Sequence, residues 1–210
     1  MRSLSVSKTK IIWVTPECEK VIGYCARVSN PANQDNPNVS KLLKYCMTKG
    51  HWSVFEMGSM CVEITTSRAI SAQILRHRSF SFQEFSQRYA EATSFETQEA
   101  RSQDLNNRQM SNDDLTEDKK SWFKCVLKHH QEKSLKLYNT AIEHGVAKEC
   151  ARSLLPLSTQ TTLYMSGTIR SWIHYLKLRT GNGTQKEHMD IALDIKETLI
   201  KEIPTLKGLI

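Results

Sequence analysis

The sequence predicts a mixed α/β (α+β) domain, with a strand-containing N-terminal half and a largely helical C-terminal half. Three observations support this class: apolar residues at helical spacing near residue 40, an alternating segment near residue 60, and long helical patterns after residue 120. The 210 residues fit one domain, expected to span residues 1–210, because neither an internal repeat nor a linker indicates a second one.

The first helical pattern lies in the segment NVSKLLKYCMTKG. Its apolar residues recur at positions i, i+3, i+4, i+7 and i+8, and these are Val39, Leu42, Leu43, Cys46 and Met47. Gly50 follows at the position where a left-handed C-terminal cap is common. The segment is therefore predicted to be an amphipathic helix that ends before Gly50.

A strand and a second helix are predicted next. In the segment MGSMCVEITT, one face carries Met60, Val62 and Ile64 and the other carries Cys61, Glu63 and Thr65, which is typical of a half-buried strand. Ser67 can then cap a helix through RAISAQILRH. On such a helix Gln73, Arg76 and His77 would share one face at the C-terminal end.

The rest of the chain is predicted to be mostly helical. The stretch from about Phe95 to Asp118 is polar and lacks a strong period, so we expect a long surface excursion there. Helices are expected at about 121–144, 146–155, 168–178 and 186–202, with Gly145 and Pro156 as stops. The third of these would bury Ile169, Trp172, Ile173 and Leu176 and expose Arg170, His174 and Lys177.

Composition limits the function classes. A formal charge of +7 and a pI near 9.1 favour acidic partners, either nucleic acid or small phosphorylated ligands. The six cysteines are scattered singly, which predicts reduced core thiols and no metal site. The early apolar run IIWV is too short for a signal peptide, and no run approaches a membrane span, so we expect a cytoplasmic protein without membrane contact.

A basic and aromatic segment, RHRSFSFQEFSQR at Arg76–Arg88, contains the main functional signal. Because the eight glycines form no phosphate-binding loop, side chains would have to hold any phosphate. Arginine suits this task because its planar fork can donate two parallel hydrogen bonds. The candidates are Arg76, Arg78, Arg88, Arg152, Arg170 and Arg179. A lone arginine is usually solvated and a phenylalanine usually packs inside, but the clustering favours an anion site.

This segment resembles the signature R-H-R-x-x-S-x-N-x-x-S-x-R of the flavin-dependent thymidylate synthases. Gln83 stands at the position usually written as Asn, a change that keeps an amide donor and acceptor. Four further segments resemble other blocks of that family in the family's order: CARVSN, KGHWSVFE, ARSLLPL and TIRSWIHYLKLR. The resemblance covers most of the chain, excluding the extreme termini and the polar excursion.

The resemblance implies a reaction and an assembly. In this family dUMP is methylated to dTMP with methylenetetrahydrofolate as carbon donor, reduced FAD supplies hydride, NADPH recharges the flavin, and tetrahydrofolate is released. The family also implies a homotetramer whose active sites are shared between subunits, with no metal and no nucleic-acid polymer as partner. The cysteine nucleophile of the classical thymidylate synthase follows a proline, and the present chain has no Pro-Cys dipeptide.

The resemblance also assigns residues. Arg179 would be catalytic, because a fixed guanidinium near uracil N3 can stabilise an anionic ring. The residues expected to bind dUMP are Gln73, Ile74, Leu75, Arg76, Glu84, Phe85, Ser86, Gln87, Arg88, Arg152 and Arg179. Those expected to bind FAD are Ser53, Arg76, His77, Arg78, Glu84, Thr168, Ile169, Arg170 and His174. Ser86 is interpreted as a binding residue and not as a nucleophile, because no sequence-adjacent base would activate it.

Two alternatives stay open at this point. A nucleic-acid-binding module could use the basic charge for phosphates and Phe80, Phe82 and Phe85 for stacking. A flavoprotein that has lost synthase activity would keep the same sequence blocks. Bound flavin would exclude the first alternative, and dUMP-dependent oxidation of NADPH would exclude the second.

Overall fold

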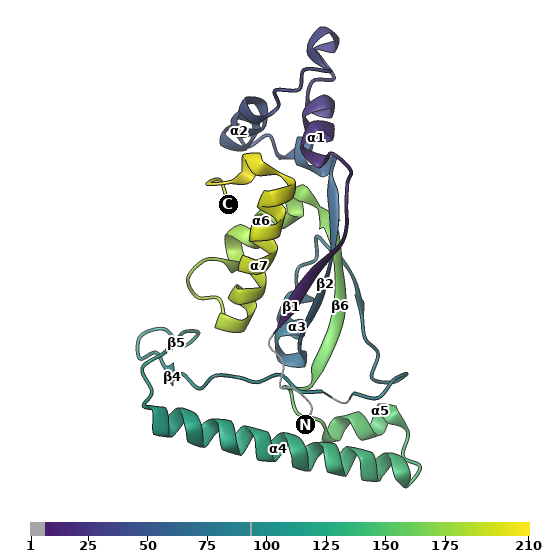
Figure 1. The fold of residues 1–210 in the computed structure, drawn as a ribbon, viewed down its shortest axis with the longest axis vertical. Coiled ribbons are helices and arrows are strands. Elements are labelled where there is room, and N and C mark those ends of the chain that lie inside the picture. The colour runs from purple at the N-terminus through teal and green to yellow at the C-terminus, as the bar shows by residue number, and fades with distance from the viewer. Residues whose placement is uncertain (1–6, 93) are drawn as a thin grey trace.

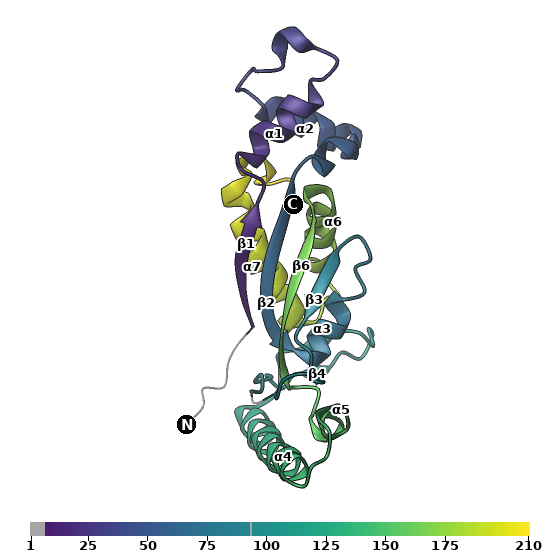
Figure 2. The ribbon, with the colours of Figure 1, turned by 90° about the vertical axis from the view of Figure 1, so that its right-hand side faces the viewer.

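The structure, a computed structural model, describes residues 7–92 and 94–210 and has the mixed α/β class that the sequence predicts. Its centre is an antiparallel sheet with the strand order β1-β2-β6-β3. The strands are β1 (Lys8–Val14), β2 (Ser59–Ser67), β6 (Gln160–Thr168) and β3 (Ser81–Glu84). They run along the long axis of the molecule (Figure 1), and a view turned by 90° shows them side by side (Figure 2).

Helices occupy one side and both ends of this sheet (Figure 1). Beside it lie α6 (Ile169–Arg179), α7 (Lys186–Glu202) and the short α3 (Arg68–Ile74). One end carries α1 (Cys18–Ala26) and α2 (Ser40–Lys49), and the other carries α4 (Glu117–Glu143) and α5 (Lys148–Ala151). The smaller elements are the 3-10 turns Pro31–Asn33, Trp52–Glu56, Arg152–Leu154 and Pro204–Leu206, and the paired strands β4 (Ser102–Gln103) and β5 (Ser111–Asn112).

The core lies between the sheet and helices α6 and α7. The strands contribute alternate residues to it: Met60, Val62 and Ile64 from β2, and Leu163 and Met165 from β6. The apolar stripes of the two helices pack against these residues: Trp172, Ile173 and Leu176 from α6, and Ile191, Ile195 and Leu199 from α7. The Nε1 of Trp172 donates to the Met60 carbonyl at 3.1 Å, so the buried indole keeps a hydrogen bond. On the other face of the sheet, the Tyr164 hydroxyl donates to Glu63 at 2.8 Å. The predicted alternation of β2 is thus confirmed.

Several predicted helices are confirmed. Gly50 follows α2 with φ of 73°, a left-handed value that a glycine adopts without a steric penalty. In α6 the four predicted stripe residues are all fully buried. Helix α7 has the expected bounds, since its stripe repeats every three to four residues over its whole length.

The helix after Ser67 is shorter than predicted. It ends at Ile74, and the chain then turns so that Ser81 can pair with Ser166 of β6. Arg76 and His77 therefore lie beyond the helix, and the prediction that they share a helical face with Gln73 is wrong. Strand β3 lies within the arginine-rich segment, and β6 lies in the half that was expected to be helical. Neither strand was predicted.

Three other expectations need correction. Helix α4 already begins at Glu117, and the polar excursion before it contains the β4–β5 hairpin and the buried Glu96. The helix expected at 146–155 is reduced to α5 and one 3-10 turn. All six cysteines are free, but Cys125 and Cys150 are exposed, so the core interpretation holds only for part of the set. Among the described residues, no helix combines the length and apolarity that crossing a membrane would need.

Candidate active site

The three phenylalanines of the arginine-rich segment differ in environment. Phe80 is 9% exposed and packs edge-on against Trp172, with 4.8 Å between ring centroids. A Cβ on Gly167 would lie 2.5 Å from the Phe80 ring, so strand β6 leaves space for this side chain. Phe82 also packs against the core, while Phe85 is 36% exposed. The Phe80 ring is thus not available to stack on a ligand, and the Phe82 ring is partly covered.

Arg179, the last residue of α6, contacts His77. Its Nε donates to the Nε2 of His77 at 3.0 Å across 102 positions of sequence. Burial and then the charge of Arg179 lower the pKa of His77 to about 4, so the ring is neutral near pH 7. Because Nε2 is the acceptor, the ring proton must be on Nδ1. The hydrogen bond uses only Nε, and among the described residues both terminal nitrogens of Arg179 are left for a ligand.

Gln73 comes from α3 and contacts α7 and the loop before it. Its Nε2 donates to the Oε1 of Gln185 at 2.7 Å, and its Oε1 lies 3.3 Å from the Nδ1 of His188. The Nε2 of His188 lies 3.1 Å from the hydroxyl of Tyr175, which packs edge-on against the predicted site residue His77. Burial, followed by the charges of Arg179 and His77, lowers the pKa of His188 to about 3.

Glu84, at the end of β3, has one oxygen fully engaged. The Nη1 of Arg68 lies 2.8 Å from Oε1, and the hydroxyls of Ser71 and Thr161 donate to the same oxygen at 2.5 and 3.1 Å. All three partners come from α3 and β6, so the carboxylate is fixed on two elements. No described residue forms a hydrogen bond with its second oxygen, Oε2, which is therefore available for a ligand.

Arg88 and Arg152 meet at Glu149. The Nε of Arg88 lies 2.9 Å from the Glu149 carboxylate, and the Nε of Arg152 donates to the Glu149 carbonyl at 3.2 Å. Within the described part of the chain, no hydrogen bond or ion pair joins this group to Arg179. The predicted nucleotide residues therefore fall into two groups in the single chain.

Part of the set predicted for the flavin lies where the turn at Trp52–Glu56 meets the start of α6, namely Ser53, Thr168, Ile169, Arg170 and His174. Ser53 lies in that turn and is exposed. The ring of His174 is 5.2 Å from that of Trp52, and the Nη1 of Arg170 lies 2.6 Å from Glu56. The structure brings these predicted residues together although about 120 positions separate their segments.

Most of the other predicted residues fall into two kinds: buried residues, which could contact a ligand only through their main chain, and residues with exposed side chains. Thr168 caps α6, since its hydroxyl accepts from the Ser171 amide at 3.3 Å. The side chains of Ile74 and Ile169 are fully buried in the core, so only their main chain could meet a ligand. Gln87 is also buried. The exposed members of the predicted set are Ser53, Leu75, Arg76, Arg78, Phe85, Ser86, Arg88 and His174.

Sequence reasoning missed the residues that hold the predicted ones. Trp52 and Glu56 lie in the segment KGHWSVFE and Glu149 lies three positions before Arg152, but none of the three was assigned a role from the sequence. His188 did have a signal: it begins the buried stripe of α7 that continues with Ile191, Ala192, Ile195 and Leu199. A histidine on an apolar stripe needs buried partners, and this could have directed attention to it.

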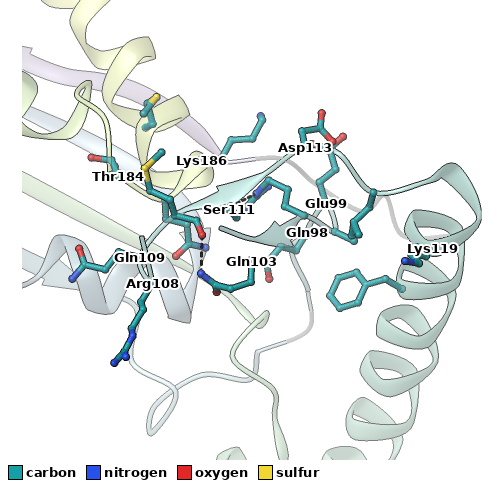
Figure 3. Close-up of a pocket in the computed structure, with 18 of the residues that line it drawn as sticks. Gln98, Glu99, Gln103, Arg108, Gln109, Ser111, Asp113, Lys119, Thr184 and Lys186 are labelled. Atoms are coloured by element: carbon teal, nitrogen blue, oxygen red, sulfur yellow. Dashed lines mark hydrogen bonds between the residues drawn. The ribbon is translucent and has the colours of Figure 1, made fainter. Parts of the chain in front are cut away.

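The structure also has a cavity of about 890 Å³ between the polar excursion, the start of α4 and the loop before α7. Figure 3 shows Gln103, Ser111, Thr184 and Lys186 around it. Among the described residues that line it, none belongs to the set predicted to bind dUMP or FAD. Gln185 and Arg101 lie in its wall, so the cavity adjoins the residues that hold Gln73.

Comparison with known proteins identifies the family. The family model described as "Thymidylate synthase complementing protein" matches residues 10–205. A flavin-dependent thymidylate synthase of Synechocystis is 54% identical over 98% of this chain and 96% of its own length, and a probable one of Paramecium bursaria Chlorella virus 1 is 54% identical over 97% and 94%.

A solved structure agrees in fold. The UMP/dUMP methylase PolB from Streptomyces cacaoi, bound with 5-Br dUMP, superposes with a TM-score of 0.85 at 24% identity, covering 96% of this chain and 93% of that one. At this identity the likeness shows the fold alone, which is the same mixed α/β arrangement. On the family match and the two relatives above, the chain belongs to the flavin-dependent thymidylate synthase family, and it is a methyltransferase that uses a flavin.

Proposed function

We propose that this chain converts dUMP to dTMP by reductive methylation, with methylenetetrahydrofolate as carbon donor, FAD as the flavin and NADPH as reductant. Family membership over nearly the whole chain supports the reaction class. The observation that carries the assignment of the site is the contact between Arg179 and His77, because it joins the arginine-rich segment to the last family block.

Arg179 is proposed to act on the pyrimidine. Its Nε is held by a neutral histidine, so the guanidinium is oriented while its terminal N–H groups stay free. Uracil C5 is a poor nucleophile until negative charge develops on the ring, and a preorganised cation stabilises that charge without rearrangement. His77 therefore serves Arg179 as an orienting acceptor.

The nucleotide is proposed to be held by two groups of side chains. Gln73 contacts His188, and Arg76 directly precedes His77, the partner of Arg179, whereas Arg88 and Arg152 converge on Glu149. A phosphate would compete with Glu149 for these exposed guanidinium groups, because bidentate arginine–phosphate pairs are strong. The full proposed dUMP set is that expected from the sequence, with Ile74, Leu75, Glu84, Phe85, Ser86 and Gln87 contributing along the segment.

The flavin is proposed to lie against the start of α6. The residues present fit such a group: the guanidinium of Arg170 suits phosphate, and Ser53 and His174 add polar contacts. Arg76, His77, Arg78 and Glu84 complete the proposed FAD set. When bound and reduced, the flavin supplies the hydride for the methyl group.

We further propose that residues 1–210 form one such domain and that it assembles as a homotetramer with shared sites. Helix α4 has 27 residues, but its buried members are Gln131, Ser134 and Tyr138. Trp122 on the same helix is 66% exposed and Leu137 is 49% exposed. Apolar side chains exposed along a long helix are suited to contact another subunit.

The test uses the purified full-length chain. We expect a flavin absorbance spectrum from the untreated protein and dTMP formation that requires dUMP, methylenetetrahydrofolate and NADPH together. Omitting each component in turn is the control. Flavin without dTMP formation would identify a flavoprotein that lacks synthase activity, and a colourless protein that binds oligonucleotides in a steeply salt-dependent way would contradict the proposal.

A further inference from the structure

The amide of Gln73 is held at both of its polar atoms. Its Nε2 donates to Gln185 at 2.7 Å and its Oε1 faces His188 at 3.3 Å. A glutamine amide has two N–H donors and two acceptor lone pairs. These contacts use one of each, which leaves one N–H and one lone pair of Gln73 for a ligand.

A carboxylate decides which way this amide points. Glu187 can only accept hydrogen bonds, and the Nη2 of Arg101 fixes it at 2.8 and 3.0 Å from its two oxygens. The amide of Gln185 must therefore turn its Nε2 toward Glu187, at 2.9 Å, and its Oε1 toward Gln73. Gln73 must in turn direct its nitrogen to Gln185 and its oxygen to His188.

The same logic sets the proton on His188. Since the oxygen of Gln73 only accepts, the Nδ1 of His188 must carry the ring proton, and its Nε2 must accept from the Tyr175 hydroxyl. Burial, then the charges of Arg179 and His77, lowers the pKa of His188, which agrees with a neutral ring that has one donor and one acceptor. Each hydrogen bond in the chain from Tyr175 to Glu187 thus pairs one donor with one acceptor.

We propose that His188 and Gln185 are positioning residues for dUMP: by fixing the Gln73 amide from both sides, they present its remaining N–H and lone pair to the nucleotide. The inference rests on the proposed function, in which Gln73 binds dUMP. Without these partners the amide could rotate and exchange its donor and acceptor, so the nucleotide would meet the wrong group. His188 and Gln185 act through Gln73 and need no contact with dUMP.

The test is a double-mutant cycle on the full-length, flavin-containing protein, with dUMP affinity measured by calorimetry. Gln73→Ala and His188→Phe should each weaken dUMP binding about tenfold, the effect of about one lost hydrogen bond. The double variant should be no weaker than Gln73→Ala alone, because His188 acts only through Gln73. A purely structural role of His188 would make the two losses multiply to about a hundredfold.

Three further variants make the outcome decisive. His188→Asn keeps an N–H donor for Gln73 and should recover most of the affinity. Because His188 is fully buried and its phenylalanine variant could fail to fold, the same cycle is repeated with Gln185→Leu, at a partly exposed position. His130→Phe, an exposed histidine substitution on α4, is the matched control and should leave dUMP affinity unchanged.

The failures of the two proposals can be told apart. If Gln73→Ala does not change dUMP affinity, the proposed role of Gln73 in nucleotide binding is wrong and the inference falls with it. If Gln73→Ala weakens binding but its effects multiply with those of His188→Phe or Gln185→Leu, the nucleotide site stands and the positioning role alone is overturned.

Discussion

The Nε of Arg179 donates to the Nε2 of His77 at 3.0 Å, so a cation and a neutral imidazole form one unit at the end of α6. His77 lies in the arginine-rich segment, and Arg179 ends the last of the family blocks, 102 positions further along the chain. The contact orients the guanidinium without neutralising it, since a carboxylate partner would have cancelled the charge that the proposed reaction needs.

Replacing Arg179 with Ala should therefore lower dTMP formation by about 10²–10³ while flavin stays bound, because one preorganised charge-stabilising group is lost. Steady-state rates at saturating dUMP and the flavin absorbance of the same preparation provide the measurement. Arg179→Lys keeps the charge but lacks the planar guanidinium that can contact His77 and a ligand together. Its rate should therefore lie between that of the unmodified chain and that of the alanine variant. Near-normal turnover of the alanine variant would remove Arg179 from the catalytic role.

The two neutral histidines predict a loss of stability in acid. His77 and His188 have folded-state pKa values lowered to about 4 and about 3, whereas an unfolded histidine titrates near its ordinary value of 6.5. Between these values the unfolded chain binds protons that the folded chain does not, so the free energy of unfolding falls as the pH falls below 6.5. From pH 7 to pH 5 the loss is up to about 2 kcal/mol for each histidine.

Denaturant unfolding at pH 7, 6 and 5 measures this dependence. His188→Asn removes one of the two groups, so the stability of that variant should depend less steeply on pH over the same range. A variant with the same pH dependence as the unmodified chain would mean that His188 is not a source of the acid sensitivity. Below pH 5 the carboxylates Asp104 and Asp113, whose pKa values are lowered by hydrogen bonds, add losses of the same sign.

The Phe80 ring of the arginine-rich segment occupies the space beside Gly167 of β6, so a larger residue at position 167 should lower the stability of the fold. A methyl group there would lie 2.5 Å from the Phe80 ring, and Trp172 prevents the ring from moving away. Gly167→Ala should destabilise the fold by about 1–3 kcal/mol, as overpacking of a core usually does. Gly181→Ala is the control, because its nearest neighbour is at an ordinary 3.5 Å. Thermal unfolding of both variants, and of Gly167→Ala combined with Phe80→Leu, would show whether a smaller ring relieves the strain.

Elements with a repeating apolar stripe were the ones that the sequence predicted well. Helices α2, α6 and α7 are confirmed because burial on one side makes apolar residues recur every three to four positions. Strand β6 was missed although Thr161, Leu163 and Met165 alternate inward. The positions of β6 that face away from the core are mostly Thr and Ser, so the contrast in polarity between its two faces is weak. The strand also lies among predicted helices and forms only by pairing with β2 and β3.

In the candidate site, too, residues within a local motif were predicted, whereas contacts between segments distant in the sequence were not. The motif and its resemblance named His77, Gln73 and Arg179, and the structure places all three around α3 and α6. The pairing of His188 with Gln73 could not be predicted, because the two residues lie 115 positions apart and meet only through tertiary packing. The buried state of Phe80 likewise depends on Gly167 of a strand that the sequence did not predict.

A substitution of Ser86 should weaken the binding of dUMP without abolishing the chemical step. It is exposed, and its carbonyl accepts the amides of Tyr89 and Ala90, so the residue shapes the turn that leads to Arg88. Ser86→Ala should raise the KM for dUMP and leave measurable turnover at saturating substrate. Complete loss of dTMP formation with dUMP still bound would instead support a covalent role for the hydroxyl.

The division of the proposed nucleotide residues predicts sites shared between subunits. Arg179 contacts His77, whereas Arg152 contacts Glu149 beside α4, the helix with exposed apolar side chains. If the two groups of one site come from different chains, Arg152→Ala and Arg179→Ala would each be inactive alone but regain activity when mixed and reassembled, because some sites would combine two intact groups. Mixing each variant with itself is the control.

Light scattering should give about four times the chain mass of 24.1 kDa. A monomer with bound flavin and full activity would contradict shared sites, and so would a tetramer whose mixed variants stay inactive after subunit exchange is verified.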